Sequence, residues 1–275
     1  MNEIAQNRRA RGRPRSAPAD VGSVQAIDRA VVLLRSLARD GDATLTELAD
    51  RANVPASSAH RVLVSLQSHG MVDFADATQE WQIGVEAFRI GSAFTRRTNI
   101  VDVAREPMRR LVEDTGETAN LAIEDGGEVV FLAQVDTANP IRAFFRAGTR
   151  VPMHSSGIGK ALLSAYDRAR ADKILRRQGL PEFTAKTLSD PEALHEDLSR
   201  TRARGWSFDD EERYQGMRCI AAPVWNVHGD PIAGVSISGP AVRFDAASLD
   251  GKGARVMQAA AEITEAMGGT PARLP

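Results

Sequence analysis

Apolar residues recur at three- and four-residue spacing in the first part of the chain. Ile27, Val31, Leu34 and Leu37 follow this spacing. It is the spacing of one face of an α-helix. The sequence therefore predicts an amphipathic helix that begins after Ser23 and ends near the turn-forming pair Asp40-Gly41.

Two more helices are predicted directly after this one. Thr44 and Glu47 in "TLTE" have the spacing of a capping box, which begins a helix that we expect to reach about Ala52. Pro55 suits the first turn of a third helix, because its missing N–H would have no partner there. Four apolar residues at helical spacing would form the inner face of that helix: Ala59, Val62, Leu63 and Leu66.

The pattern then changes to alternation. Val72 and Phe74 precede a polar turn, and Trp81 and Ile83 follow it, which predicts a two-stranded hairpin. Three helices and a hairpin are typical of a winged helix-turn-helix, whose third helix enters the major groove of DNA. The opposite face of that helix is rich in hydroxyls and suits phosphates and base edges, although a packing module with a polar exterior would look similar. The predicted DNA-binding residues of this domain are Thr44, Ser57, Ser58, His60, Arg61 and Ser65.

The remainder of the chain alternates between helices and strands. Residues 85–100 resemble a linker helix with Phe88 and Phe94 as packing anchors, and further helices are expected around 101–115, 159–168 and 190–204 and from about Leu249. Strands are expected in "TANLAIED", "EVVFLAQV", "IRAFFRAG", "CIAAPVWN" and "PIAGVSISG", and Gly126-Gly127 favours a hairpin turn. The fold class is therefore α+β, with an antiparallel sheet in the second domain.

Composition and charge narrow the picture. The chain has 275 residues, 43% of them hydrophobic, which is enough for two domains. It contains no apolar run long enough to cross a membrane and no secretory signal pattern, and its single cysteine, Cys219, fits a cytoplasmic protein. Residues 1–70 contain ten Arg against seven Asp or Glu, although the whole chain has a net charge of −1. A basic N-terminal part of the chain suggests an anionic binding partner.

The first residues contain the arginines that produce this asymmetry. Residues 1–22 have few apolar side chains and predict a disordered tail. Within "RRARGRPRS", Arg11, Arg13 and Arg15 surround Gly and Pro in the manner of an AT-hook arm, which binds a narrow minor groove. A merely solvated tail is the alternative.

Several motifs occur in an order that resembles the IclR family of bacterial transcription factors. They are "LTELADRANVPASSAHRVL", "TGETANLAI", "VPMHSSGIGKALL", "GWSFDDEE", "GMRCIAAPVWN" and "VSISGPAVRF". The resemblance spans Val24 to about Ala266. It implies a DNA-binding domain at 23–84, a linker at 85–100 and a GAF-like effector-binding and oligomerisation domain at 101–275. It also implies a homodimer or dimer of dimers on double-stranded operator DNA, and a small organic acid as effector.

Two stretches suit the binding of an acid. Free amides of Gly157 and Ile158 at the start of a helix would attract a carboxylate, unless "SSGIGK" is only a glycine-rich helix start. Ser236 and Ser238 are two apart on a strand and share one side of it, which could also be a solvent-facing edge. The resemblance extends the effector site to Asp209 and Cys219, with the apolar walls Val151 and Met217.

The carboxylate of Asp209 would repel an anionic ligand unless it accepts a hydrogen bond from a ligand hydroxyl, such as that of a hydrated aldehyde. This favours a small oxo or hydroxy acid, with glyoxylate as the first expectation and another small carboxylate or an aromatic acid as alternatives. Two alternatives belong to other classes of function. One is an enzyme that uses Cys219, His154 and Asp209, and the other is a protein-binding sensor that no longer binds DNA. No nucleophile-elbow or P-loop motif occurs and the histidines are scattered, so no catalytic residue, cofactor or metal site is predicted.

Overall fold

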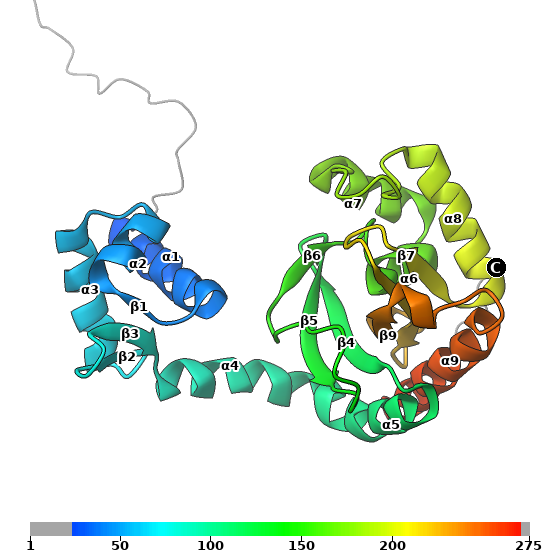
Figure 1. The fold of residues 1–275 in the computed structure, drawn as a ribbon, viewed down its shortest axis with the longest axis horizontal. Coiled ribbons are helices and arrows are strands. Elements are labelled where there is room, and N and C mark those ends of the chain that lie inside the picture. Colours follow the sequence, from blue (N-terminus) through cyan, green and yellow to red (C-terminus); the bar gives the residue numbers. More distant parts are fainter. Residues whose placement is uncertain (1–23, 271–275) are drawn as a thin grey trace, which may run out of the picture. The chain divides into compact units, whose positions relative to one another are not determined.

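A computed structural model describes residues 24–270, and side chains within this range except those of residues 95–98. Arg11, Arg13 and Arg15 lie outside the described residues. The chain divides into two compact units between Ala93 and Phe94. Helix α4 (Val85–Thr98) crosses this division (Figure 1).

The N-terminal unit contains three helices and a small sheet. The helices are α1 (Gln25–Asp40), α2 (Leu45–Ala52) and α3 (Ala56–Ser68). The strands are β1 (Ala43–Thr44), β2 (Val72–Ala75) and β3 (Glu80–Ile83), in the order β1-β3-β2. The predicted helix-turn-helix and hairpin are confirmed, and β1 adds a third strand that the sequence did not predict.

Local sequence explains where these helices begin. The predicted capping box is present, because Thr44 Oγ1 accepts the Glu47 amide at 3.5 Å and Glu47 Oε2 accepts the Thr44 amide at 3.0 Å. Pro55 is the N-cap of α3 and lies one position before the helix. The core of this unit contains six fully buried side chains: Leu33, Ala43, Leu48, Ala59, Leu63 and Val72.

Within a single chain, the two predicted anchors of the linker helix, Phe88 and Phe94, are not buried. Phe88 is 75% exposed and Phe94 is 39% exposed. Val85 and Ile90 on the same helix are exposed as well. The apolar spacing correctly indicated an amphipathic helix. It could not show whether another part of the same chain packs against the apolar face of that helix.

The C-terminal unit is built on a six-stranded antiparallel sheet with the order β6-β5-β4-β9-β8-β7. Its strands are β4 (Thr118–Asp125), β5 (Glu128–Val135), β6 (Arg150–Pro152), β7 (Ser207–Asp210), β8 (Met217–Trp225) and β9 (Pro231–Pro240). Its helices are α5 (Ile100–Thr115), α6 (Gly157–Ala165), α7 (Arg168–Gln178), α8 (Pro191–Arg204) and α9 (Leu249–Ala266), with the short 3₁₀ helix η1 (Ala241–Arg243).

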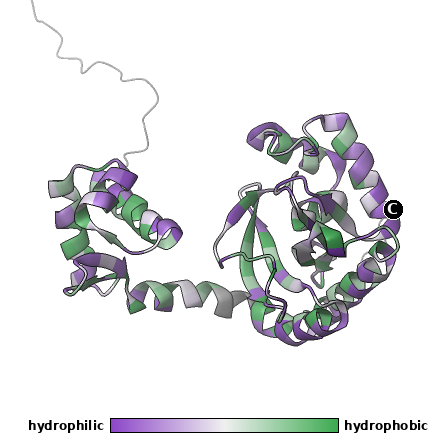
Figure 2. Ribbon diagram, viewed as in Figure 1, coloured by the Kyte–Doolittle hydropathy of each residue, from purple (hydrophilic) through white to green (hydrophobic). Residues whose placement is uncertain are grey.

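Helices cover both faces of this sheet. α5 and α9 pack on one face, whereas α6, with α7 and α8 outside it, covers the other (Figure 1). Hydrophobic residues concentrate on the strands, and the outer sides of α7 and α8 are largely hydrophilic (Figure 2). The expected α+β class with an antiparallel sheet is confirmed.

Strand alternation decides which side chains face α6. On β9, Val235 and Ile237 belong to the core beneath α5 and α9, so Ser236 and Ser238 point to the opposite face. On β8, Ile220 lies in the same core, so Cys219 points toward α6. A two-residue period thus gathers polar residues on one face of a buried sheet.

Three local predictions were wrong or incomplete. The segment "IRAFFRAG" does not form a strand, and the neighbouring residues Arg150–Pro152 form β6 instead. No element was predicted for the acidic stretch containing Asp209, which is the edge strand β7, because it pairs with β8. The helix expected around 159–168 ends at Ala165, and α7 follows it as a separate helix that was not predicted. Of the residues of α7, only Ala171 and Leu175 are buried, which is a weak apolar signal.

Candidate functional site

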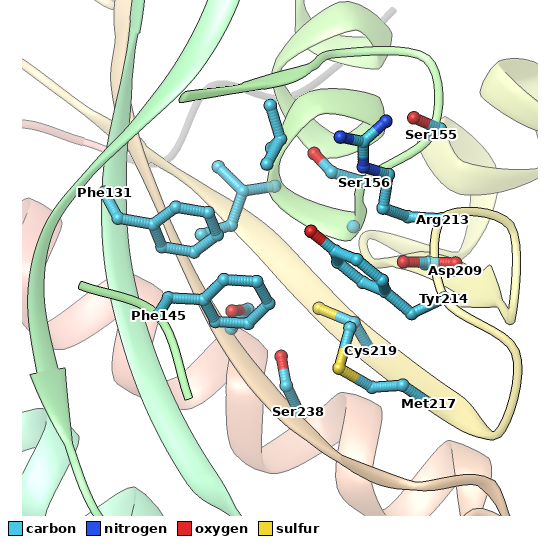
Figure 3. A pocket seen from close by; sticks show the side chains of 14 residues that line it. Phe131, Phe145, Ser155, Ser156, Asp209, Arg213, Tyr214, Met217, Cys219 and Ser238 are labelled. Carbon is cyan, nitrogen blue, oxygen red and sulfur yellow. The ribbon is translucent and has the colours of Figure 1, made fainter. Parts of the chain in front are cut away.

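One pocket between the start of α6 and the sheet brings together all eight residues predicted to bind an effector. Figure 3 shows side chains converging on it from the strands, the start of α6 and the loop after β7. The eight predicted residues that line it are Val151, Gly157, Ile158, Asp209, Met217, Cys219, Ser236 and Ser238.

Strand register explains why residues far apart in sequence meet here. Asp209 on β7 is paired with Cys219 on β8, and Cys219 is paired with Ser238 on β9. These three residues therefore form a row across the sheet, perpendicular to the strands. Ser236 lies one step along the same face, and Asn120 on β4 donates to Ser238 Oγ at 3.3 Å.

The start of α6 forms the opposite wall. Ser156 caps this helix, since its Oγ accepts the Gly159 amide at 3.0 Å. Gly157 must be small, because a Cβ at this position would lie 2.6 Å from Cys219 Sγ. Glycine thus allows the backbone to approach the sheet closely, and the positive end of the helix dipole lies beside the pocket.

Asp209 is a buried acid in an unusual electrostatic setting. Its side chain is 3% exposed, and its carboxylate Oδ1 accepts the Glu212 amide at 2.8 Å. Burial, and then the nearby charge of Glu212, raise the pKa of Asp209 to about 7. The group can therefore be protonated or ionised near neutral pH, so it can donate a hydrogen bond as well as accept one.

A buried ion cluster supports the strand that carries Asp209. The ammonium of Lys160 is fully buried and contacts Asp197 at 2.9 Å and Glu212 at 2.5 Å. It also donates to the carbonyl of Phe208 at 2.5 Å. The backbone amide of Glu212 donates to the carboxylate of Asp209. The cluster therefore connects α6 and α8 to the acid in the pocket.

Six further pocket residues were not predicted. Phe131 and Phe145 form a wall of stacked rings with centroids 4.4 Å apart. No local sequence signal marked the others, since they reach the pocket from loops. The complete set is Phe131, Phe145, Ser155, Ser156, Arg213 and Tyr214.

Several polar atoms in the pocket have no hydrogen-bond partner. They are Ser155 Oγ, Ser236 Oγ, and Nε and Nη1 of Arg213. Buried polar groups are almost always paired, so such a group needs an explanation such as a ligand. The cavity is small, about 20 Å³, on a scale where roughly 10–15 Å³ holds one water molecule. These features suit a small polar ligand.

The geometry argues against thiol catalysis. Burial, and then the charge of Asp209, raise the pKa of the Cys219 thiol to about 12, whereas a nucleophilic cysteine needs a lowered pKa. His154 Nε2 lies 3.0 Å from the Pro181 carbonyl oxygen, and burial lowers its pKa. His154 does not line the pocket. Among residues 24–270 no cluster of His, Cys, Asp or Glu could hold a metal ion.

A second, larger hollow of about 570 Å³ lies between α7 and α8. Its charged side chains satisfy one another: Arg168 contacts Glu192 at 3.2 Å, and His195 Nε2 lies 2.7 Å from Asp172 Oδ1. The smaller pocket at the start of α6 differs from it because several of its polar atoms lack partners. We therefore treat the smaller cavity as the candidate ligand site.

The outer face of α3 is the candidate DNA interface. Ser57, His60, Arg61 and Ser65 are exposed on it. Ser58 is half-buried and its Oγ accepts from Arg29 at 3.4 Å. Thr44, also predicted to contact DNA, uses its hydroxyl in the capping box and donates to Glu47 Oε2 at 2.8 Å.

Within the part of the chain that the structure describes, no helix combines the length and hydrophobicity that a bilayer span requires.

Comparisons with known proteins agree with this organisation. Residues 26–75 match the IclR helix-turn-helix domain, and residues 92–265 match the C-terminal domain of bacterial IclR transcriptional regulators. The chain is 47% identical over 264 residues to the HTH-type transcriptional regulator BhcR of Paracoccus denitrificans, covering 94% of this chain and 95% of BhcR. It is 40% identical over 257 residues to the transcriptional repressor IclR of Escherichia coli, covering 92% and 93%.

Solved structures show the same architecture. IclR of Thermotoga maritima superimposes with a TM-score of 0.75 at 29% identity, covering 88% of this chain and 98% of that protein. An IclR homologue of Microbacterium hydrocarbonoxydans, solved with 4-hydroxybenzoate, has the same fold with a TM-score of 0.79 at 23% identity, covering 89% and 99%. These relatives are regulators rather than enzymes. Because family models match residues 26–75 and 92–265, and curated regulators match nearly the whole chain, the chain belongs to the IclR family of DNA-binding bacterial transcriptional regulators.

Proposed function

We propose that this regulator controls an operon of small-organic-acid metabolism and that a small oxo or hydroxy acid, glyoxylate in the first instance, alters its DNA binding. In this proposal residues 23–84 bind operator DNA, residues 85–100 link the domains, and residues 101–275 bind the effector and oligomerise. The observation that carries the proposal is the row of Asp209, Cys219 and Ser238 facing the start of α6.

The chemistry of the row supports a ligand with both a carboxylate and a hydroxyl-bearing carbon. Hydroxyls of Ser236 and Ser238 can donate to a ligand oxygen, and the positive end of α6 favours negative charge in the pocket. Asp209 can accept a hydrogen bond from a hydroxyl of a hydrated aldehyde. The small cavity favours an acid of few atoms, because an aromatic acid would require the rings of Phe131 and Phe145 to move.

The exposed face of α3 supports sequence-specific DNA binding. Arg61 lies at its centre, is exposed, and forms no ion pair with another residue in the described part of the chain. A free guanidinium on a recognition helix can bind a guanine edge or a phosphate. Arg11, Arg13 and Arg15 would add contacts from the N-terminal arm.

Unpaired apolar surface in the N-terminal unit supports self-association. Ile27 on α1 is 60% exposed, and Phe88 on α4 is one of several exposed apolar residues of that helix. We propose that a second copy of the chain covers such surface in a homodimer, which two half-sites on the operator would match. Phe88→Asp should then lower the mass measured by light scattering.

Fluorescence anisotropy tests the regulatory function directly. Full-length protein is titrated into labelled DNA from upstream of its own gene, with scrambled DNA as control, at fixed salt and with or without glyoxylate. A specific affinity that changes with glyoxylate supports the proposal. Equal affinity for scrambled DNA would contradict DNA recognition, and an unchanged specific affinity would contradict glyoxylate as effector.

Variants separate the two sites. Arg61→Ala should weaken DNA binding by about 1–3 kcal/mol without changing effector affinity. Ser236→Ala and Asp209→Ala should weaken glyoxylate binding, measured by calorimetry, without changing DNA affinity. Ser164→Ala is the matched control, because Ser164 is a buried serine outside the pocket. Unchanged glyoxylate affinity in both pocket variants would refute the pocket assignment.

A further inference from the structure

Arg213 is a positively charged residue that faces the pocket without a polar partner. It lies in the loop between β7 and β8, and its side chain reaches over the pocket near Ser155 and Ser156 (Figure 3). Its guanidinium carbon lies 3.7 Å from the centre of the Phe183 ring and 5.5 Å from that of Tyr214. These rings position the guanidinium, but its Nε and Nη1 are buried without a hydrogen-bond acceptor.

The neighbouring ion cluster is balanced within itself. Lys160 is held between Asp197 and Glu212, and Arg200 contacts Asp197 at 3.5 Å. The carboxyl group of Asp209 accepts the Glu212 amide. None of these carboxylates forms an ion pair with Arg213 among residues 24–270. The guanidinium of Arg213 is therefore a positive charge without an ion-pair partner, and it fits a ligand with one negative charge.

The positive charge of Arg213 also offsets the repulsion expected at Asp209, which lies beside it in Figure 3. A ligand carboxylate placed against Asp209 would meet a like charge. In Figure 3, Arg213 and Ser155 lie at one end of the pocket and Ser238 and Met217 at the other. A carboxylate at the Arg213 end would have donors from the guanidinium and from the unpaired Ser155 hydroxyl, while the other end of the ligand faces the sheet.

We infer that Arg213 binds the carboxylate of the effector and thereby orients its oxo or hydroxy end toward Asp209 and the serines of β9. The inference rests on the proposed function and specifies its ligand class as a small monocarboxylate with a hydroxyl or hydrated carbonyl on the adjacent carbon. A planar guanidinium can donate two parallel hydrogen bonds to a carboxylate, which a lysine cannot do.

Calorimetry with two matched ligands tests this orientation. Glyoxylate carries a carboxylate beside its aldehyde, whereas glycolaldehyde carries an uncharged hydroxymethyl group at the same place. Full-length wild type, Arg213→Gln and Arg213→Lys are titrated with both. Arg177→Gln is the control, because Arg177 is an exposed arginine of α7 outside the pocket.

Arg213→Gln should weaken glyoxylate binding roughly 10- to 100-fold, as expected for a lost charge-assisted hydrogen bond, and should leave glycolaldehyde binding unchanged. Arg213→Lys should keep part of the preference for glyoxylate, and Arg177→Gln should match the wild type. DNA affinity without ligand should be the same in all four proteins, which also verifies that the variants are folded.

Other outcomes overturn the inference in distinguishable ways. Unchanged glyoxylate affinity in Arg213→Gln, or an equal loss for both ligands, would refute the role of Arg213 in binding a carboxylate while the proposed function stands. Wild type is also titrated with glycolate and pyruvate, and a wild type that binds none of the three acids would refute both the inference and the proposed ligand class.

Discussion

Replacing Asp209 with asparagine should raise the free energy of unfolding of the C-terminal unit, and this gain should increase with pH. Asparagine has the same shape, and its carbonyl can still accept the Glu212 amide that Asp209 accepts at 2.8 Å. It carries no charge, so it avoids the cost of ionising a group that is 3% exposed. Asp209, which we propose to bind the ligand, would then lower the stability of the ligand-free protein.

The magnitude follows from the two pKa values. The pKa of Asp209 is about 7 in the folded protein, against an ordinary value of 3.8. As pH rises above 3.8 the unfolded chain releases the proton first, so the wild type loses stability until the folded state also ionises near pH 7. With about 1.4 kcal/mol per pH unit, this cost is about 2 kcal/mol at pH 5.5 and about 4 kcal/mol at pH 8.

Urea unfolding at pH 5.5 and pH 8, in buffers without carboxylates, measures the difference. Trp206 and Trp225 are buried in the C-terminal unit and report its unfolding, and a Trp81→Phe background removes the signal of the N-terminal unit. The advantage of the asparagine variant should increase by about 2 kcal/mol between the two pH values, independently of how the amide packs. An advantage that stays constant or shrinks with pH would refute the reasoning.

Three further predictions concern other parts of the fold. Lys160→Met should destabilise the C-terminal unit by about 3–5 kcal/mol in urea unfolding, because two buried carboxylates lose their counter-charge; a loss below about 1 kcal/mol would contradict that role. Gly157→Ala should abolish glyoxylate binding in calorimetry and preserve DNA affinity, since its Cβ would lie 2.6 Å from Cys219 Sγ, and adding Cys219→Ala should restore part of the binding if crowding is the cause. Thr44→Ala should lower the stability of the N-terminal unit by about 1 kcal/mol in thermal unfolding, while Thr44→Ser should retain most of it; equal losses in both variants would exclude the capping hydroxyl as the cause.

The sequence alone determined the features that depend on neighbouring residues. Helical spacing and the Thr44–Glu47 capping box located α1 and α2, and alternation located the hairpin of β2 and β3. Side chains two apart share a strand face, so the spacing of Ser236 and Ser238 was sufficient to place them on one side of β9. Gly157 and Ile158 carried the physical signal of a helix start, whereas Asp209, Cys219, Val151 and Met217 came from resemblance to a family.

Only the tertiary structure decided what depends on pairing between distant segments. Asp209 lies in an acidic run that looks like a solvated turn, yet pairing with Cys219 makes it part of a buried edge strand. Arg213 and Phe145 reach the pocket from loops without a periodic pattern, and Phe88 has the spacing of a packed residue but remains exposed. Local spacing fixes which direction a side chain takes from its own element, whereas burial, counter-charges and pKa values depend on which other elements cover it.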